Sequence, residues 1–119
     1  MTYDSDNIFA KILRGEIPND TVYEDEHVLA FKDIAPHMPV HILILPKGAY
    51  TDIDDFGKNA SDAEIAALFR AVPKVAEKMG ITEDGFRMVS NCKTHGGQEV
   101  PHLHLHILGG DKVGPMTRE

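Results

Sequence analysis

The sequence has little of several features that would point to particular protein classes. Cys92 is the only cysteine in 119 residues, so no disulfide can form within the chain, which fits a reducing compartment. No apolar run is long enough to cross a bilayer, and the polar N-terminus lacks the apolar core of a secretory signal. We therefore expect a soluble, cytoplasmic protein that does not bind membranes.

Basic residues are also scarce. Twelve Lys and Arg stand against nineteen Asp and Glu, which gives a formal net charge of -7 at pH 7. Such an acidic chain does not attract DNA, RNA or anionic membranes at long range, so nucleic acid is not an expected partner. Any anionic ligand must be held locally, by histidines, backbone amides and neutral side chains.

Apolar residues, at 42%, are sufficient for the core of one domain over residues 1–119. Helical spacing predicts a short helix within residues 6–18. A long helix should begin at Ser61, in a capping box with Glu64, and end at Gly80 after a kink at Pro73. With strands expected at 21–25, 27–33, 40–46, 85–91 and 102–110, the fold class is α+β. It comprises a mainly antiparallel five-stranded sheet, one short N-terminal helix and one long helix.

Three of the seven histidines occupy alternate positions in PHLHLHILGG, residues 101–110. Alternate side chains of a strand project from one face, so His102, His104 and His106 should share a face. A solvated strand face would explain a single histidine, but three give up much packing capacity, so we favour a functional site. Gly96 and Gly97, just upstream, offer backbone amides that no side chain obstructs.

Two kinds of chemistry are open to this histidine cluster. His-x-His on a strand can chelate a metal, but His102 and His106 would lie about 13 Å apart at ~3.3 Å per residue, too far for one zinc ion. Two of the histidines with His41 or Glu99 could still bind one. The other chemistry is covalent catalysis at phosphorus, because imidazole is a nucleophile near neutral pH and phosphorylated imidazole leaves readily. We favour the second, with His104 as the nucleophile and no metal or cofactor.

The motif HLHLHIL resembles the histidine triad signature, His-φ-His-φ-His-φ-φ with φ apolar. Further segments extend the resemblance, in order and over nearly the whole chain, to the Hint branch, the purine nucleoside phosphoramidases. They are NIFAKILRGEIP, VYEDEHVLAFKDIAP, HILILPK, GFRMVSN and GGQEVPHLHLHILGG. The resemblance implies a small α+β subunit that forms a homodimer through its long helix and the neighbouring sheet.

The resemblance also implies residue roles. His104 would attack the α-phosphorus of a purine nucleoside 5'-phosphoramidate or an aminoacyl adenylate, and water would then release AMP from the adenylylated enzyme. His106 would contact phosphate and leaving group, with His102 and His41 as a supporting pair behind the nucleophile. Asp33 would hold the ribose hydroxyls. Contacts to phosphate or leaving group are implied for Asn91, Gly97 and Gln98, and the wall of the base pocket for Ile8, Phe9, Ile12, Phe31, Ile34 and Leu43.

Without the family, some of these residues have simpler interpretations. Asp33 could be a turn carboxylate before Pro36, and His41 a core histidine with satisfied hydrogen bonds. Asn91 could end a strand, and several of the apolar residues could be plain core. The resemblance favours the site, and the strand spacing agrees with it, because residues two apart, such as His41 and Leu43, face one side.

Glu99 departs from the animal Hint pattern, which has a serine that donates a hydrogen bond in the site. An ionised carboxylate cannot donate, and a phosphate repels it. We hypothesise that Glu99 lies near the leaving group and favours substrates whose departing part is positively charged. A solvated loop glutamate is the alternative.

Two other functions stay open for the whole protein. One is a Fhit-like dinucleoside polyphosphate hydrolase, an enzyme of the same superfamily; the ending HILGG and the later GPM favour the Hint branch. The other is a regulatory protein that binds nucleotides or partners and turns nucleotides over only incidentally. The same pocket would serve each of these functions.

Overall fold

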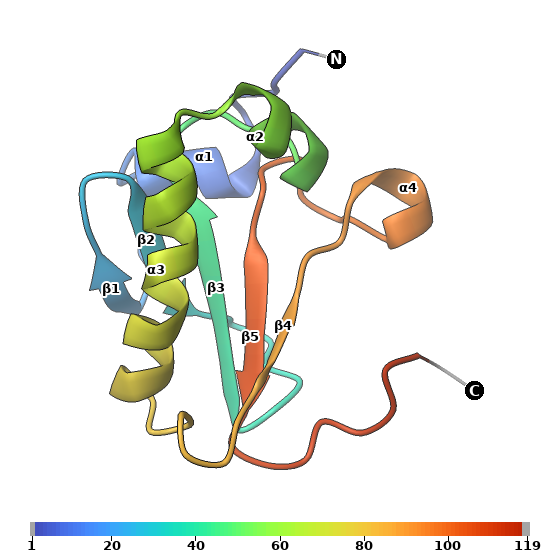
Figure 1. The fold of residues 1–119 in the computed structure, drawn as a ribbon. Helices are drawn as coiled ribbons and strands as arrows, with labels where there is room; N and C mark the ends of the chain where they lie inside the picture. The colour runs from blue at the N-terminus through green and yellow to red at the C-terminus, as the bar shows by residue number, and fades with distance from the viewer. Residues whose placement is uncertain (1, 118–119) are drawn as a thin grey trace.

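The computed structural model describes residues 2–117. The domain predicted over residues 1–119 therefore includes three terminal positions, 1, 118 and 119, that lie outside the described residues. Five strands form one sheet in the order β1-β2-β3-β5-β4, and each neighbouring pair is antiparallel. The strands are β1 (Thr21–Glu24), β2 (Val28–Lys32), β3 (Val40–Pro46), β4 (Arg87–Val89) and β5 (Leu105–Gly109) (Figure 1). The α+β prediction with a five-stranded antiparallel sheet is confirmed.

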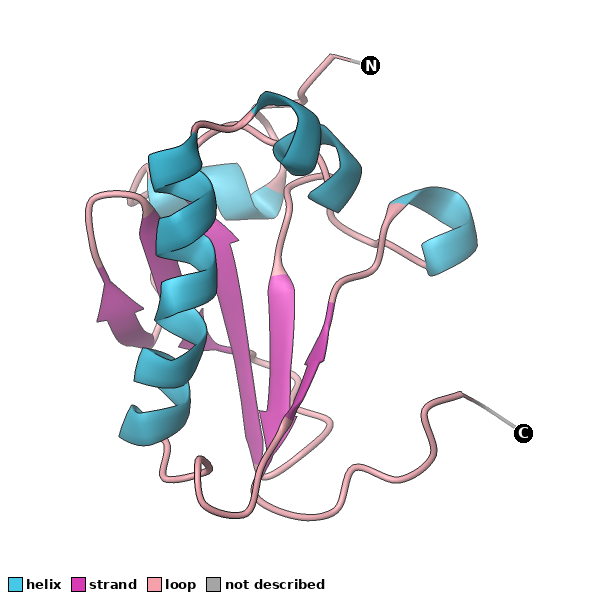
Figure 2. Ribbon diagram, in the orientation of Figure 1, coloured by secondary structure: helices cyan, strands magenta, loops and turns pink. Residues whose placement is uncertain are grey.

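The helices of the described residues are α1 (Ile8–Leu13), α2 (Ile53–Asn59), α3 (Asp62–Lys78) and α4 (Lys93–Gly96) (Figure 2). The sequence predicted α1 and α3 but not α2 or α4. These two helices have seven and four residues, too few for an apolar stripe of helical period to appear. In the part of the chain that the structure describes, no helix is both long enough and apolar enough to cross a membrane.

The long helix α3 begins as its sequence predicts. The Ser61 hydroxyl accepts from the backbone N–H of Glu64 at 3.1 Å, and the Glu64 carboxylate accepts from the backbone N–H of Ser61 at 3.0 Å. Pro73 lies inside the helix, which continues through it to Lys78. The proline therefore removes one backbone donor without ending the helix.

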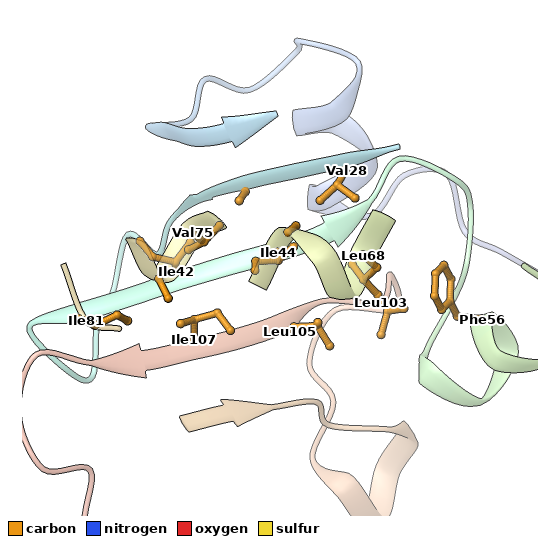
Figure 3. Close-up of a cluster of buried hydrophobic side chains, with 13 residues drawn as sticks. Val28, Ile42, Ile44, Phe56, Leu68, Val75, Ile81, Leu103, Leu105 and Ile107 are labelled. Carbon is orange, nitrogen blue, oxygen red and sulfur yellow. The ribbon is translucent and has the colours of Figure 1, made fainter. Parts of the chain in front are cut away.

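The sheet separates two apolar clusters. On one face, α3 packs against side chains from the central strands, including Ile42, Ile44, Leu105 and Ile107 (Figure 3). On the other face, α1 packs through Phe9 and Ile12 against β2 and β3, whose contributing residues are Leu29, Phe31, Leu43 and Leu45. Strand β3 is thus covered on both faces, as its continuous apolar sequence predicts.

The last strand is shorter than predicted. It begins at Leu105, not at His102, because its ladder with β3 ends at the pair Ile44 and Leu105. The chain before this pair leaves the sheet: the backbone N–H of Leu103 donates to the carbonyl of Tyr50 at 2.8 Å. His102 and His104 therefore lie in the segment that leads into β5, beyond the regular ladder.

Candidate active site

A cavity of about 560 Å³ lies over the face of the sheet that α1 covers. Residues from α1, β2, β3, β5 and the loop before β5 line it, so segments far apart in the sequence meet there. It holds all six residues of the predicted base wall: Ile8, Phe9, Ile12, Phe31, Ile34 and Leu43. It also holds seven of the nine other predicted site residues: Asp33, His41, Asn91, Gly97, Glu99, His104 and His106.

His104 has a defined orientation. Its Nδ1 lies 2.8 Å from the backbone carbonyl oxygen of His102, and because a carbonyl only accepts, Nδ1 carries the proton. The lone pair of the neutral ring is then on Nε2. The ring lies edge-on to Phe9, with ring centres 4.8 Å apart, and burial lowers its pKa against the raising effects of the His102 carbonyl, Asp33 and Glu99. His104 therefore holds an unprotonated nitrogen near neutral pH.

His106 is held by a second histidine from β3. The backbone N–H of His37 donates to Nδ1 of His41 at 3.1 Å, so His41 carries its proton on Nε2. That Nε2 lies 2.9 Å from Nδ1 of His106 and 3.3 Å from an Asp33 carboxylate oxygen. Nδ1 of His106 therefore accepts, and its Nε2–H is left as a donor. Burial and the neighbouring histidines His104 and His41 lower the pKa of His106 to about 4.

His102 and His41, the predicted supporting pair, contact two different histidines. His102 lies behind His104, which it contacts through its backbone carbonyl, whereas His41 lies behind His106. His102 is fully buried and does not line the cavity; its ring lies edge-on to those of Tyr3 and Phe9. Of the three alternating imidazoles, two face the cavity and the third supports them from beneath.

Asp33 is both a turn carboxylate and a residue of the cavity, the two interpretations that its sequence allowed. One carboxylate oxygen accepts from the backbone N–H of Ala35 at 2.8 Å, as a turn carboxylate does. The other lies beside His41, and the side chain is 19% exposed on the cavity wall. The carboxylate is therefore both a local turn contact and a polar group open to a ligand.

The loop before β5 differs from the expectation in two respects. Gln98 does not line the cavity: its side-chain amide donates to the carbonyls of Thr51 and Val100, and its oxygen accepts from the N–H of Lys93. The backbone N–H groups of Gly97 and Gln98 donate to carbonyls of α4. Both amides are thus used to end α4, and Gly97, at φ 76°, supplies the left-handed residue that this ending requires. They are not free for a phosphate in this conformation.

Glu99 lies where the cavity opens to solvent. Its side chain is exposed, and within residues 2–117 no hydrogen bond or ion pair engages its carboxylate. Its charge is close enough to raise the pKa of His104. The carboxylate is therefore available to a cationic group near the nucleophile.

Asp33, His41 and His106 bring three ligand atoms within 4.8 Å of one another. The set resembles a two-histidine, one-carboxylate metal site. His41, however, carries its proton on Nε2, the atom that would have to bind the ion, because its Nδ1 accepts from the His37 backbone. The hydrogen bonds of these residues fit a chain that orients His106 better than a metal site.

Among the residues not identified from the sequence, two hold the histidines of the site in place. His37 lines the cavity and fixes His41 through its backbone; its position four residues before His41 in a short loop was the available signal. Tyr3 donates to His102 from 99 positions away. No local pattern can reveal such a contact.

Comparison with known proteins shows the family of this chain. The family model of the HIT domain matches residues 14–113. The chain belongs to the HIT family. A HIT-like protein of Azospirillum brasilense is 58% identical to this HIT protein over 115 residues, 97% of this chain and 94% of that one. The purine nucleoside phosphoramidase of Escherichia coli K12 is 46% identical over 111 residues, 93% of this chain and 92% of that enzyme.

Solved structures of HIT proteins share the fold. A histidine triad protein from Clostridium difficile matches with a TM-score of 0.85 and 42% identity, covering 98% of this chain and all of that one (100%). A HIT family hydrolase from Clostridium thermocellum matches with a TM-score of 0.86 and 43% identity, covering 94% of this chain and 96% of that one. This HIT protein therefore has both the fold and the size of known members.

Proposed function

We propose that this HIT protein hydrolyses purine nucleoside 5'-phosphoramidates or aminoacyl adenylates to AMP through a covalent nucleotidyl-His104 intermediate. The observation that carries the proposal is the orientation of His104, whose Nδ1–H is donated to the His102 carbonyl. This leaves the Nε2 lone pair available in a cavity of nucleotide size. The similarity to a purine nucleoside phosphoramidase and to HIT family hydrolases supports hydrolysis as the reaction class.

In the first step the Nε2 lone pair of His104 forms a bond to the α-phosphorus, and the bond from phosphorus to the leaving nitrogen breaks. The electron pair of that bond stays on the nitrogen, which takes a proton from solvent, while Nε2–H of His106 donates a hydrogen bond to a phosphate oxygen. The phosphorylated imidazole keeps its Nδ1–H on the His102 carbonyl and carries a positive charge, so it is a good leaving group.

In the second step water attacks phosphorus, and the bond from phosphorus to His104 breaks. The water proton passes to solvent, and AMP is released with His104 restored. His41 keeps Nδ1 of His106 hydrogen-bonded in both steps, so Nε2–H of His106 stays a donor to the phosphate oxygens.

The nucleoside would occupy the apolar part of the cavity. Phe9 from α1 and Phe31 from β2 lie edge to face, with ring centres 5.9 Å apart, and offer an aromatic surface to a flat base. Asp33 would accept hydrogen bonds from the ribose hydroxyls. An apolar wall does not choose a base, so the purine preference rests on the similarity to the phosphoramidase.

The proposal is tested by mixing the protein with a purine nucleoside phosphoramidate, quenching rapidly, and measuring the intact and peptide masses. A nucleotidyl adduct on His104 is expected. An adduct on another residue would contradict the assignment of the nucleophile. Faster turnover of a diadenosine polyphosphate would favour the Fhit-like alternative, and AMP binding without turnover of either substrate would favour the regulatory one.

The mechanism uses imidazoles and hydrogen bonds for all its charge handling, with no metal or cofactor. We expect full activity after exhaustive chelation. Loss of activity that added zinc restores would instead assign a metal to Asp33, His41 and His106.

We also propose that the protein is a cytoplasmic homodimer, joined through β4 and α3. In the described sheet β4 pairs only with β5, so its outer edge is open to a second copy. Met88 on β4 and Phe69 on α3 are 42% and 47% exposed, which is high for large apolar side chains. Light scattering at micromolar concentration should give twice the 13.2 kDa chain mass, and a monomeric mass would contradict the proposal.

A further inference from the structure

Tyr3 contacts the buried histidine that lies beneath the nucleophile. Its hydroxyl oxygen is 2.5 Å from Nδ1 of His102, and its ring lies edge-on to the imidazole, with ring centres 5.6 Å apart and planes at 71°. His102 is 0% exposed, whereas Tyr3 is half-buried in the segment before α1. The N-terminal segment therefore covers His102 and supplies a polar partner for it.

The direction of this hydrogen bond follows from the other side of the ring. Nε2 of His102 lies 2.8 Å from the carbonyl oxygen of Pro46, which can only accept, so Nε2 carries the proton. Burial lowers the pKa of His102 to about 4, which leaves the ring neutral above pH 5. Nδ1 is then an acceptor, and the Tyr3 hydroxyl donates to it.

The position of His102 matters because its carbonyl orients His104. This carbonyl lies outside the regular ladder of β5, in the loop that leads into the strand. Hydrogen bonds hold this segment: the backbone N–H groups of Leu103 and His102 donate to the carbonyls of Tyr50 and Val100. The His102 ring adds two bonds, to Tyr3 and Pro46. If the His102 ring loses one of these hydrogen bonds, the His102 backbone is held less firmly. Its carbonyl is the group that accepts from Nδ1 of His104.

We propose that Tyr3 is a positioning residue for the nucleophile, acting through His102. Its hydroxyl fixes the His102 ring, the ring fixes the backbone carbonyl, and the carbonyl keeps the His104 proton on Nδ1, so that Nε2 stays unprotonated toward the cavity. The inference rests on the proposed function for its effect on rate. Its effect on the tautomer of His104 is independent of that function.

The test compares Tyr3→Phe with the wild type and with Tyr23→Phe. Tyr23 is a matched control, because its half-buried hydroxyl donates to Asp25 and its residue does not line the cavity. Tyr3→Phe should lower kcat for a purine nucleoside phosphoramidate by about tenfold with KM little changed, since an unsatisfied buried acceptor lets the nucleophile leave its reactive geometry. Tyr23→Phe should leave kcat unchanged.

Histidine ¹⁵N spectra of the same three proteins give a readout that a purely structural role would not move. In the wild type His104 should have its proton on Nδ1 and His102 on Nε2. In Tyr3→Phe the Nδ1 signal of His102 should lose its hydrogen-bond shift, and His104 should gain a population with the proton on Nε2. These spectra need no substrate, so they test the inference even if the wild type does not hydrolyse a phosphoramidate.

Two results would overturn the inference. One is a Tyr3→Phe protein whose His104 tautomer matches that of the wild type, whatever its kcat. The other is an altered tautomer with kcat unchanged in an active enzyme, because positioning would then have no catalytic consequence. All spectra and rates are compared below the unfolding transition of each variant, measured by circular dichroism, so that lost stability is not read as lost positioning.

Discussion

On the α3 face of the sheet, Leu103, Leu105 and Ile107 are no more than 1% exposed and pack into a continuous apolar cluster (Figure 3). On the α1 face of the same segment, His104 and His106 line a cavity. Alternate residues of one segment therefore have different roles, packing on one face and chemistry on the other. The filled face supplies stability, whereas the other gives up packing volume and places polar rings where burial keeps them neutral.

Replacing His104 tests the functional face most directly. His104→Ala should lower turnover of a phosphoramidate by at least about 1000-fold, because it removes the nucleophile. AMP binding and thermal stability should change little, because the leucine face is untouched. Steady-state rates, AMP titration and thermal melting check the three quantities; a comparable loss of AMP affinity would mean that the residue mainly binds nucleotide.

Replacing Leu105, the next residue, tests the filled face. Leu105→Ala should lower the free energy of unfolding by about 2–5 kcal/mol, because the side chain is 1% exposed and its removal leaves a cavity in the core. The turnover per folded molecule should stay near that of the wild type. Urea denaturation and kcat on the same samples separate the two; a large fall in kcat with unchanged stability would break the division between the faces.

The buried imidazoles make the cavity face sensitive to acid. The pKa values of His102 and His106 are lowered from 6.5 to about 4, so below pH 6.5 the unfolded chain binds protons that the folded chain does not. Their contribution to the free energy of unfolding is complete above pH 6.5 and falls as the pH drops from 6.5 to 4. The fall is on the order of 3 kcal/mol for the fully buried His102 and smaller for His106, which is partly open to the cavity. Urea denaturation across this range checks the slope.

A matched pair of histidine variants shows which residue causes the fall in unfolding free energy between pH 6.5 and pH 4. His102→Gln should make the dependence of unfolding free energy on pH less steep and leave the share of His106. His95→Gln, which changes an exposed histidine outside the cavity, should leave that dependence unaltered. Equal slopes in both variants would mean that His102 does not contribute to the acid sensitivity.

The smallest expected effect concerns Glu99 at the cavity rim. Glu99→Gln should lower kcat/KM for a lysyl phosphoramidate by about three- to fivefold and leave an uncharged alkyl phosphoramidate unaffected, because an exposed charge pair contributes little free energy. Glu83→Gln removes the same charge outside the cavity and should affect neither substrate. Equal effects of Glu99→Gln on both substrates would assign Glu99 to the solvated loop.

Periodicity and turn chemistry in the sequence determined the fold class, the five strands, the capping box of α3 and the alternation that separates the leucines from the histidines. These are local properties, since side-chain spacing follows from backbone geometry. The family resemblance added which residues gather around the cavity, and the structure brings most of them to it. The short helices α2 and α4 escaped prediction because one or two turns carry no periodic signal.

Only the tertiary structure decided how the site residues are paired and protonated. It placed His102 behind His104 and His41 behind His106, it turned the Gln98 side chain toward Thr51, and it brought Tyr3 onto His102. The last three contacts join segments distant in the sequence, and the bond from His104 to the His102 carbonyl depends on where the chain leaves the regular strand. A histidine's tautomer is set by the partner that its second nitrogen meets, and that partner is known only once the chain has folded.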